Sequence, residues 1–123
     1  MNPNSDSIQS QAARPVKRVG MVNELRPEYL DEYRRLHAEG HPGVRDLLSK
    51  YHLRNFSIFL HNVAGRWLEF GCYEYHGENF DADMAALAAE PRNQEWLVRC
   101  DPMQAPLEGE TGWTVMERVY FNP

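Results

Sequence analysis

The sequence predicts an α+β fold, in which one antiparallel sheet carries helices on one of its faces and the elements follow the order βαββαβ. Three observations predict it. Two stretches of strand-like composition are joined by Asn62-Val63-Ala64-Gly65, a turn of hairpin length. Helical periodicity follows the first predicted strand and returns after the hairpin. A last alternating stretch ends the chain, which completes the ferredoxin-like split motif.

The first strand is predicted at Val16–Asn23, because this stretch is rich in branched and apolar residues. A helix should begin at Pro27, whose fixed φ suits the first helical position. The residues of one helical face recur at the expected spacing and are Tyr29, Leu30, Tyr33, Leu36 and His37. Tyr33 and His37 are therefore expected to point the same way.

His37 is expected near the C-terminal end of this helix, because Gly40-His41-Pro42-Gly43 breaks the periodicity. A second short helix should follow, with Pro42 near its first position and with apolar residues at helical spacing, namely Val44, Leu47, Leu48 and Tyr51. The negative end of a helix dipole favours a cation. We therefore expect an imidazolium at His37 to be stabilised, with a proton ready to donate.

The second strand is predicted at Arg54–His61, with Phe56, Ile58 and Leu60 on one face, and the third at Arg66–Tyr75. These two strands should pair antiparallel. Helices on one face leave the other face of such a sheet bare, and aromatic side chains would lie on it. We therefore expect the sheet to curl around a ligand cavity, to pack against a second chain, or both.

The second helical region is predicted to begin at Asn79, a good capping residue, and to stop before Pro91. A further short helix should span Pro91–Cys100. A loop at Met103–Gly112 then leads to the last predicted strand, Trp113–Phe121, in which apolar and polar residues alternate.

A length of 123 residues, with 42% hydrophobic and 25% charged residues, suits one small globular domain. We expect a flexible polar leader at residues 1–15 and a single domain at residues 16–123. The net charge of -5 comes without a basic stripe, which argues against nucleic acid or a membrane surface as a partner.

Cys72 and Cys100 are too few for a disulfide framework and match no metal motif, so free thiols in a reducing cytoplasm are expected. The sequence contains no run of about 18 apolar residues and no signal-peptide core. These features together predict a soluble cytoplasmic protein.

Several stretches of the sequence resemble the L-rhamnose mutarotase family, in the family's order and spacing from about Val16 to the C-terminus. They are EYRRLH (32–37), RNFSIFL (54–60), FDADMAALAAEP (80–91), QEW (94–96), DPMQAPL (101–107) and WTVMERVY (113–120). The resemblance implies a cofactor-free homodimer of α+β barrels. It also implies an activity, the interconversion of the α and β anomers of a deoxy sugar such as L-rhamnose or L-fucose.

By this resemblance, His37 matches the family's proton-donating histidine and Tyr33 its substrate-binding tyrosine, while Trp96 matches the first residue of a paired tryptophan motif. The sequence departs from the pattern where Phe56 replaces a frequent tyrosine and where Leu97 takes the second tryptophan position. His41-Pro42 also stands where Trp-Pro is common. These departures lean toward L-fucose or a related 6-deoxy-L-sugar without separating it from L-rhamnose.

Mutarotation needs one proton removed from the anomeric hydroxyl and one delivered to the ring oxygen, so a second proton-transfer group must accompany His37. Four residues are candidates for it, and the sequence does not choose among Glu69, Glu74, Glu117 and His41. His37 and His41 also have the spacing of paired metal ligands, but Pro42 interrupts the helix there and no third ligand is evident, so no metal is expected.

Two other functions remain open. A cofactor-free monooxygenase uses the same fold and also places a histidine above an aromatic cavity. A non-catalytic sugar-binding protein would need no proton transfer at all. Taken by itself, a histidine such as His37 on an amphipathic helix is more often structural than catalytic.

Overall fold

The computed structural model describes residues 15–123 of the chain, so the leader expected at residues 1–15 lies outside the described residues except for Pro15. Its strands are β1 (Lys17–Leu25), β2 (Leu53–Val63), β3 (Arg66–Tyr75), β4 (Gln104–Ala105) and β5 (Thr114–Met116). Its helices are the 3-10 turns η1 (Pro27–Tyr29) and η2 (Asp101–Met103) and the α-helices α2 (Leu30–Leu36), α3 (Arg45–Lys50), α4 (Phe80–Ala89) and α5 (Pro91–Cys100).

The strands form one antiparallel sheet in the spatial order β2-β3-β1-β4, and β5 also pairs with β1. The predicted hairpin joins β2 to β3. Its turn holds Ala64 and Gly65 at positive φ, and the Gly65 N–H donates to the Asn62 side chain at 3.1 Å. A register shift between Arg54 and Ser57 marks a bulge in β2, which turns the strand locally.

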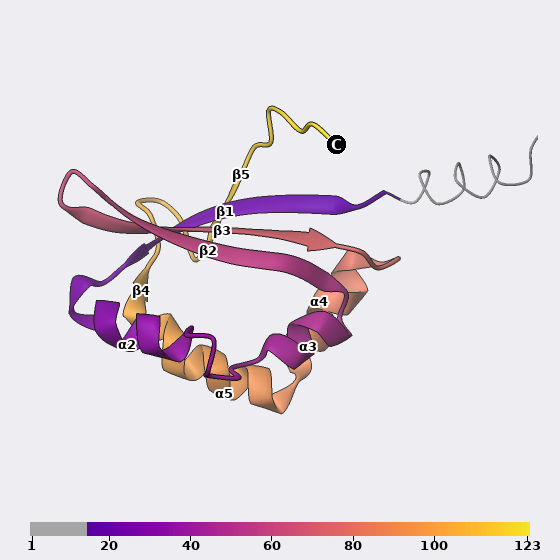
Figure 1. Ribbon diagram of the computed structural model, residues 1–123, viewed down its shortest axis with the longest axis horizontal. Helices are drawn as coiled ribbons and strands as arrows, with labels where there is room; N and C mark the ends of the chain where they lie inside the picture. Colours follow the sequence, from indigo (N-terminus) through magenta and orange to yellow (C-terminus); the bar gives the residue numbers. More distant parts are fainter. Residues whose placement is uncertain (1–14) are drawn as a thin grey trace, which may run out of the picture.

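The helices lie together on one side of the curled sheet, as predicted (Figure 1). Two clusters of buried side chains fill the space between these layers. The first contains Leu25, Tyr33, Leu36, Cys100 and Met103. The second contains Val44, Leu47, Leu53, Tyr75 and Leu87. Trp96 of α5 packs against both clusters, so it lies where the two halves of the core meet.

The α+β class and the βαββαβ order are confirmed, and most predicted elements lie close to their predicted bounds. Asn79 caps α4 as predicted, because its side chain accepts the Ala82 N–H at 3.1 Å. Both β1 and β2 continue beyond their predicted ends, since pairing with β3 holds residues that composition alone does not mark as strand. The predicted loop at Met103–Gly112 contains the short strand β4, which the sequence did not indicate.

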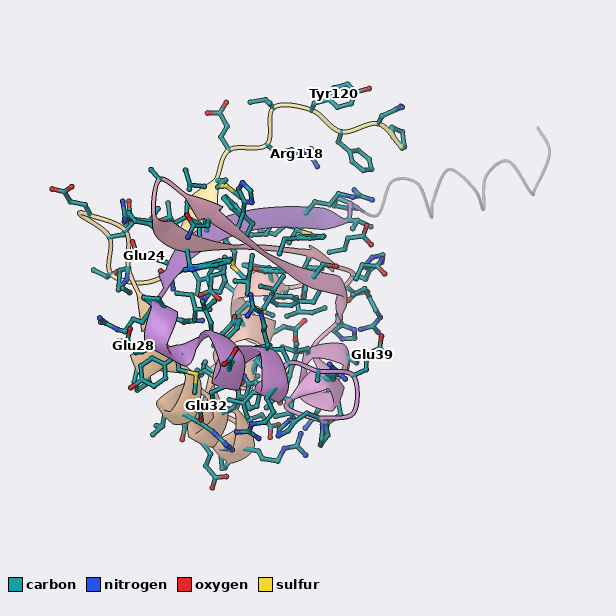
Figure 2. The ribbon with its side chains drawn as sticks, turned by 60° about the vertical axis from the view of Figure 1, so that its left-hand side comes forward. Glu24, Glu28, Glu32, Glu39, Arg118 and Tyr120 are labelled. Atoms are coloured by element: carbon teal, nitrogen blue, oxygen red, sulfur yellow. The ribbon has the colours of Figure 1, made fainter. Side chains whose placement is uncertain are left out.

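The last predicted strand, Trp113–Phe121, is wrong for most of its length, since only Thr114–Met116 pairs with β1. Alternation reports the propensity for a strand, but a strand also needs a neighbour to bond with. After Met116 the chain leaves β1, and the Phe121 ring then lies 3.8 Å from the Arg18 guanidinium. Figure 2 shows Arg118 and Tyr120 on this segment, which projects from the side of the sheet opposite the helices.

Candidate active site

A cavity of about 660 Å³ lies between the sheet and the helices. Residues from four of the strands and from all four α-helices line it, which places it inside the curl of the sheet. All five side chains that the sequence singled out line its wall, namely Tyr33, His37, Phe56, Trp96 and Leu97. A concave, mostly apolar site with a few polar groups is the usual form of a small-molecule site.

His37 is held in place by Tyr33, the residue one helical turn before it. It forms the C-terminal cap of α2, and its ring nitrogen Nδ1 lies 2.8 Å from the Tyr33 backbone carbonyl oxygen. A carbonyl oxygen only accepts, so Nδ1 carries the hydrogen and Nε2 remains available. The two rings also stack, with centroids 4.1 Å apart. The predicted common direction of Tyr33 and His37 is confirmed.

Arg45 of α3 holds the backbone at the end of α2. Its guanidinium donates to the carbonyl oxygens of His37 (3.0 Å), Ala38 (3.1 Å) and Glu39 (2.9 Å). These bonds satisfy carbonyls that a helix C-terminus leaves without partners, and they bring a positive charge to the negative end of the dipole. The positive charge at this end of α2 therefore comes from the Arg45 guanidinium, whereas the sequence analysis expected it to come from a His37 imidazolium.

The expected stabilisation of the His37 imidazolium is wrong. Burial lowers the pKa of His37 below its ordinary value of 6.5, and the hydrogen bond to Tyr33 opposes this only in part. The charges of Arg45 and His41 lower it further. The sequence analysis allowed for the helix dipole but had no means of knowing that the ring would be desolvated beside a guanidinium. At neutral pH the neutral imidazole, with Nε2 as an acceptor, is the favoured form.

Trp96 forms another side of the site. Its ring meets the His37 ring edge-on, with centroids 5.4 Å apart, and lies 5.9 Å from the His41 ring. Gly43 makes this close packing possible, because its φ is +53 and an added Cβ would lie 3.3 Å from the indole. The break that follows α2 thus ends the helix and also provides the space in which the Trp96 indole packs. Leu97, the next residue, lines the cavity while remaining 40% exposed.

Phe56 reaches the cavity from the bulged part of β2. The bulge begins after Arg54, and Asn55 adopts a positive φ of 53. The Phe56 ring then stacks on the ring of Tyr73 of β3, with centroids 5.1 Å apart and planes at 26°. Both rings line the cavity and offer flat apolar surface to a ligand.

Of the four candidates for a second proton-transfer group, two lie away from the cavity. Glu74 bonds to Asn55 at 3.0 Å and to His76 at 2.9 Å, outside the cavity wall. Glu117 lies in the exposed C-terminal segment. His41 lines the cavity. Glu69 is 0% exposed and lies next to Tyr33.

Burial dominates the ionisation of the groups behind the site. It raises the pKa of Glu69 from an ordinary 4.5 to about 7, against a smaller lowering effect of Tyr33. Burial and the nearby Glu69 charge raise the pKa of Tyr33 far above its usual range. The Cys100 thiol has a pKa raised to about 11, again by burial. Near neutral pH, Tyr33 and Cys100 are therefore protonated.

Several lining residues were not among the predicted site residues, notably Arg45, Tyr73, Gln104 and Trp113. For Tyr73 a signal existed, because it lies at even spacing along β3 from the buried Glu69 and Tyr75. Gln104 gave no signal, since the strand that presents it has only two residues. Within residues 15–123, no group of three or more His, Cys, Asp or Glu side chains is arranged to hold a metal ion. None of the helices in that range has the length and apolar content needed to cross a membrane.

Three comparisons with known proteins bear on this site. A family model described as L-rhamnose mutarotase matches residues 18–121. An L-rhamnose mutarotase from Lactiplantibacillus plantarum is 39% identical over 49 residues, an alignment that spans 40% of this chain and 47% of the relative. The crystal structure of an L-rhamnose mutarotase from Formosa agariphila is similar, with a TM-score of 0.63 and 16% identity over 87% of this chain and 99% of the other.

The similar structure places this chain among the small α+β proteins with a curled antiparallel sheet. The match over residues 18–121 goes further, and the chain belongs to the L-rhamnose mutarotase family. This family is one of sugar isomerases, so the resemblance found in the sequence is confirmed.

Proposed function

We propose that this protein is a cofactor-independent mutarotase that interconverts the α and β anomers of a 6-deoxy-L-sugar, L-rhamnose or L-fucose. The observation that carries the proposal is the stacked pair of Tyr33 and His37 in the wall of a 660 Å³ cavity. His37 presents a ring whose tautomer is fixed, so Nε2 is free to exchange a proton with the sugar. Membership of the L-rhamnose mutarotase family supports the same activity.

Mutarotation requires only an acid and a base that are positioned beside the sugar. Nε2 of His37 would take the anomeric proton as the ring opens and return it as the ring closes on the other face of the aldehyde. No oxidant or reductant takes part. A positioned acid or base typically contributes about 100- to 10,000-fold, which suits the acceleration of an exchange that also runs slowly in water.

The walls of the cavity favour a deoxy sugar. Trp96 and Phe56 would supply flat apolar surfaces to its C–H face and its methyl group. Gln104 and the partly exposed Leu97 lie in the same wall, and they would add one hydrogen-bonding group and one apolar contact. The absence of a hydroxyl at Phe56 removes one polar contact and is the feature most relevant to the choice between the two sugars.

The working form is proposed to be a homodimer in the cytoplasm, with residues 16–123 as its single domain. Exposed apolar side chains support a second copy, since Val119 is 86% exposed, Tyr120 77% and Phe59 63%. An exposed apolar surface of this kind commonly marks an interface. Both cysteines are free thiols, which supports a reducing compartment.

Saturation-transfer NMR of anomer exchange tests the activity. Purified protein is added to L-rhamnose, to L-fucose and, as a control without the 6-deoxy group, to D-glucose. We expect the exchange of one or both deoxy sugars to speed up well beyond that in buffer and beyond any effect on glucose. Unchanged exchange of both deoxy sugars would refute the proposal, and oxygen uptake with an aromatic substrate would then support the monooxygenase alternative.

A further inference from the structure

Glu69 lies within β3, directly opposite Asn23 of β1, and both side chains are buried, at 0% and 2% exposure. Neither carboxylate oxygen of Glu69 has a hydrogen-bond partner of ordinary geometry among residues 15–123, and the same holds for Asn23 Oδ1. Buried polar groups are nearly always paired, because leaving one unpaired costs free energy. A carboxylate kept in such a place therefore calls for a functional explanation.

Tyr33 interacts with Glu69 and also belongs to the cavity wall. Its ring lines the cavity, whereas Glu69 is not part of the wall. Its hydroxyl is coupled electrostatically to the Glu69 carboxylate and to the Gln104 side chain, although no ordinary hydrogen bond joins Tyr33 to Glu69. One tyrosine thus contacts both the space where a sugar would bind and a carboxylate that has no access to that space.

The groups that face Glu69 are neutral near pH 7. Asn23 faces it from β1, Tyr33 from α2 and Cys100 from α5. The pKa of the Cys100 thiol is about 11, and that of Tyr33 lies above its usual range, so both keep their protons. Among the residues that the structure describes, no cation affects the ionisation of Glu69, and burial raises its pKa to about 7. Glu69 can therefore gain or lose a proton near neutral pH.

We propose that Glu69 is the second proton-transfer group of this site and that it acts through the Tyr33 hydroxyl, an inference that rests on the proposed mutarotase activity. The other candidates are placed less well. Glu74 is engaged with Asn55 and His76, and Glu117 lies in the exposed C-terminal segment. His41 lines the cavity on the same side as His37, where both contact Trp96.

The proton transfers balance. As the ring opens, the C1–O5 bond breaks, and O5 takes the phenolic proton of Tyr33 while Tyr33 takes the carboxyl proton of Glu69. Nε2 of His37 takes the proton of O1, and C1 and O1 become the aldehyde. The aldehyde turns about the C1–C2 bond. On closure O5 attacks the other face of C1, its proton returns through Tyr33 to Glu69, and His37 returns its proton to O1.

The resting state follows from the order of the two pKa values. Glu69, with a pKa of about 7, holds a proton more tightly than His37, whose pKa lies below 6.5. The active form carries one proton between the two groups, on Glu69, with His37 neutral. Acid inactivates the site by protonating His37, and base inactivates it by removing the proton from Glu69.

The test is the pH dependence of the protein-catalysed exchange rate, corrected at each pH for exchange in buffer alone. The wild-type rate should fall above pH 7 as Glu69 ionises. Glu69→Gln keeps the shape of the side chain but cannot titrate. We expect this variant to lose roughly 100-fold in kcat and to lose the fall above pH 7, with KM for the sugar nearly unchanged. Tyr33→Phe should lose the same alkaline limb, because it removes the link to Glu69.

Glu74→Gln is the matched control, since it makes the same change on the same strand at a residue outside the cavity wall. It should keep the wild-type rate and the wild-type alkaline limb. A further readout is independent of activity: in protein with 13C-labelled glutamate carboxyls, the resonance that disappears in Glu69→Gln should titrate near pH 7.

A Glu69→Gln variant that keeps the wild-type rate and alkaline limb would overturn this inference, as would a Glu69 resonance that titrates near pH 4.5. Such results would leave the mutarotase proposal standing, provided that the wild-type protein accelerates the exchange. If the wild-type protein accelerates exchange of neither deoxy sugar, the proposed function fails first, whatever the variants do.

Discussion

The rings of Tyr33 and His37 are stacked with their planes at 30°, and Nδ1 of His37 lies 2.8 Å from the backbone carbonyl oxygen of Tyr33. One residue therefore supplies both the surface against which the imidazole packs and the acceptor that fixes its tautomer. Arg45 holds the backbone that carries the imidazole. Because these contacts set the direction of Nε2 before any ligand arrives, a small sugar would meet a base that is already oriented.

Tyr33→Phe should weaken sugar binding modestly. Removing one hydroxyl removes about one hydrogen bond, which corresponds to about 0.5–1.5 kcal/mol and so to roughly a 2- to 10-fold higher dissociation constant. The stacking surface on His37 is kept, so the fold should persist. Isothermal titration with the sugar measures the affinity, and circular dichroism checks the fold. An unchanged dissociation constant would make the hydroxyl irrelevant to ligand binding.

The stability of the protein should depend on pH through Glu69. The pKa of this carboxyl is raised from 4.5 to about 7 on folding, so between these values the folded state binds more protons than the unfolded state. Stability due to this group is therefore present below pH 4.5 and is lost as the pH rises to about 7. The loss is at most roughly 3–4 kcal/mol, since one pKa unit corresponds to about 1.4 kcal/mol.

Chemical denaturation of wild-type protein and of Glu69→Gln at pH 5 and pH 8 measures this effect. As the pH rises, the unfolding free energy of the variant should increase relative to that of the wild type, because the amide of the variant does not ionise. A difference in unfolding free energy that is the same at both pH values would show that Glu69 ionises as an ordinary surface carboxyl does. The other titratable groups are the same in both proteins, so their contributions to the pH dependence of the unfolding free energy cancel in the comparison.

Leu36→Ala should destabilise the fold by about 2–5 kcal/mol. Leu36 is 1% exposed and belongs to the buried cluster that seats α2, the helix that carries Tyr33 and ends at His37. Val98→Ala serves as the control, since Val98 is 76% exposed and should change stability by less than about 0.5 kcal/mol. Urea denaturation measures both. Equal stabilities of the two variants would mean that α2 is not anchored through Leu36.

Charged residues in the C-terminal segment should disrupt the proposed homodimer. Val119 and Tyr120 are 86% and 77% exposed, so aspartate at both positions should change the stability of a single chain little. At an interface, the same charges would be desolvated and would favour separate chains. Sedimentation velocity should therefore find a dimer for the wild type and a monomer for the variant. A monomeric wild type would refute the dimer without affecting the fold.

Much of this fold could be predicted because local rules and long-range contacts agree. Turn residues at 62–65 and the capping Asn79 determine structure within a few residues, and both predictions are confirmed. The last strand could not be bounded, because its end depends on where β1 stops offering partners. The short strand β4 likewise exists only through its pairing with Glu24 and Leu25.

The sequence pointed to side chains that line one cavity, but it did not predict the electrostatics of that cavity. Helical spacing gave the shared direction of Tyr33 and His37, which is confirmed. The pKa of His37 was not predictable, because it depends on burial and on Arg45, which the chain brings back from the next helix. The sequence offered Glu69 as one of four carboxylate or histidine candidates. Only its complete burial and its interaction with Tyr33 distinguish it from the others.

The most direct test of the central claim, that His37 exchanges protons with the sugar, is saturation-transfer NMR of anomer exchange with wild-type protein and with His37→Ala. L-rhamnose and L-fucose are measured in parallel, and circular dichroism confirms that the variant is folded. We predict accelerated exchange with the wild type for at least one of the sugars and exchange at the buffer rate with the folded variant. Undiminished exchange with His37→Ala would contradict the account.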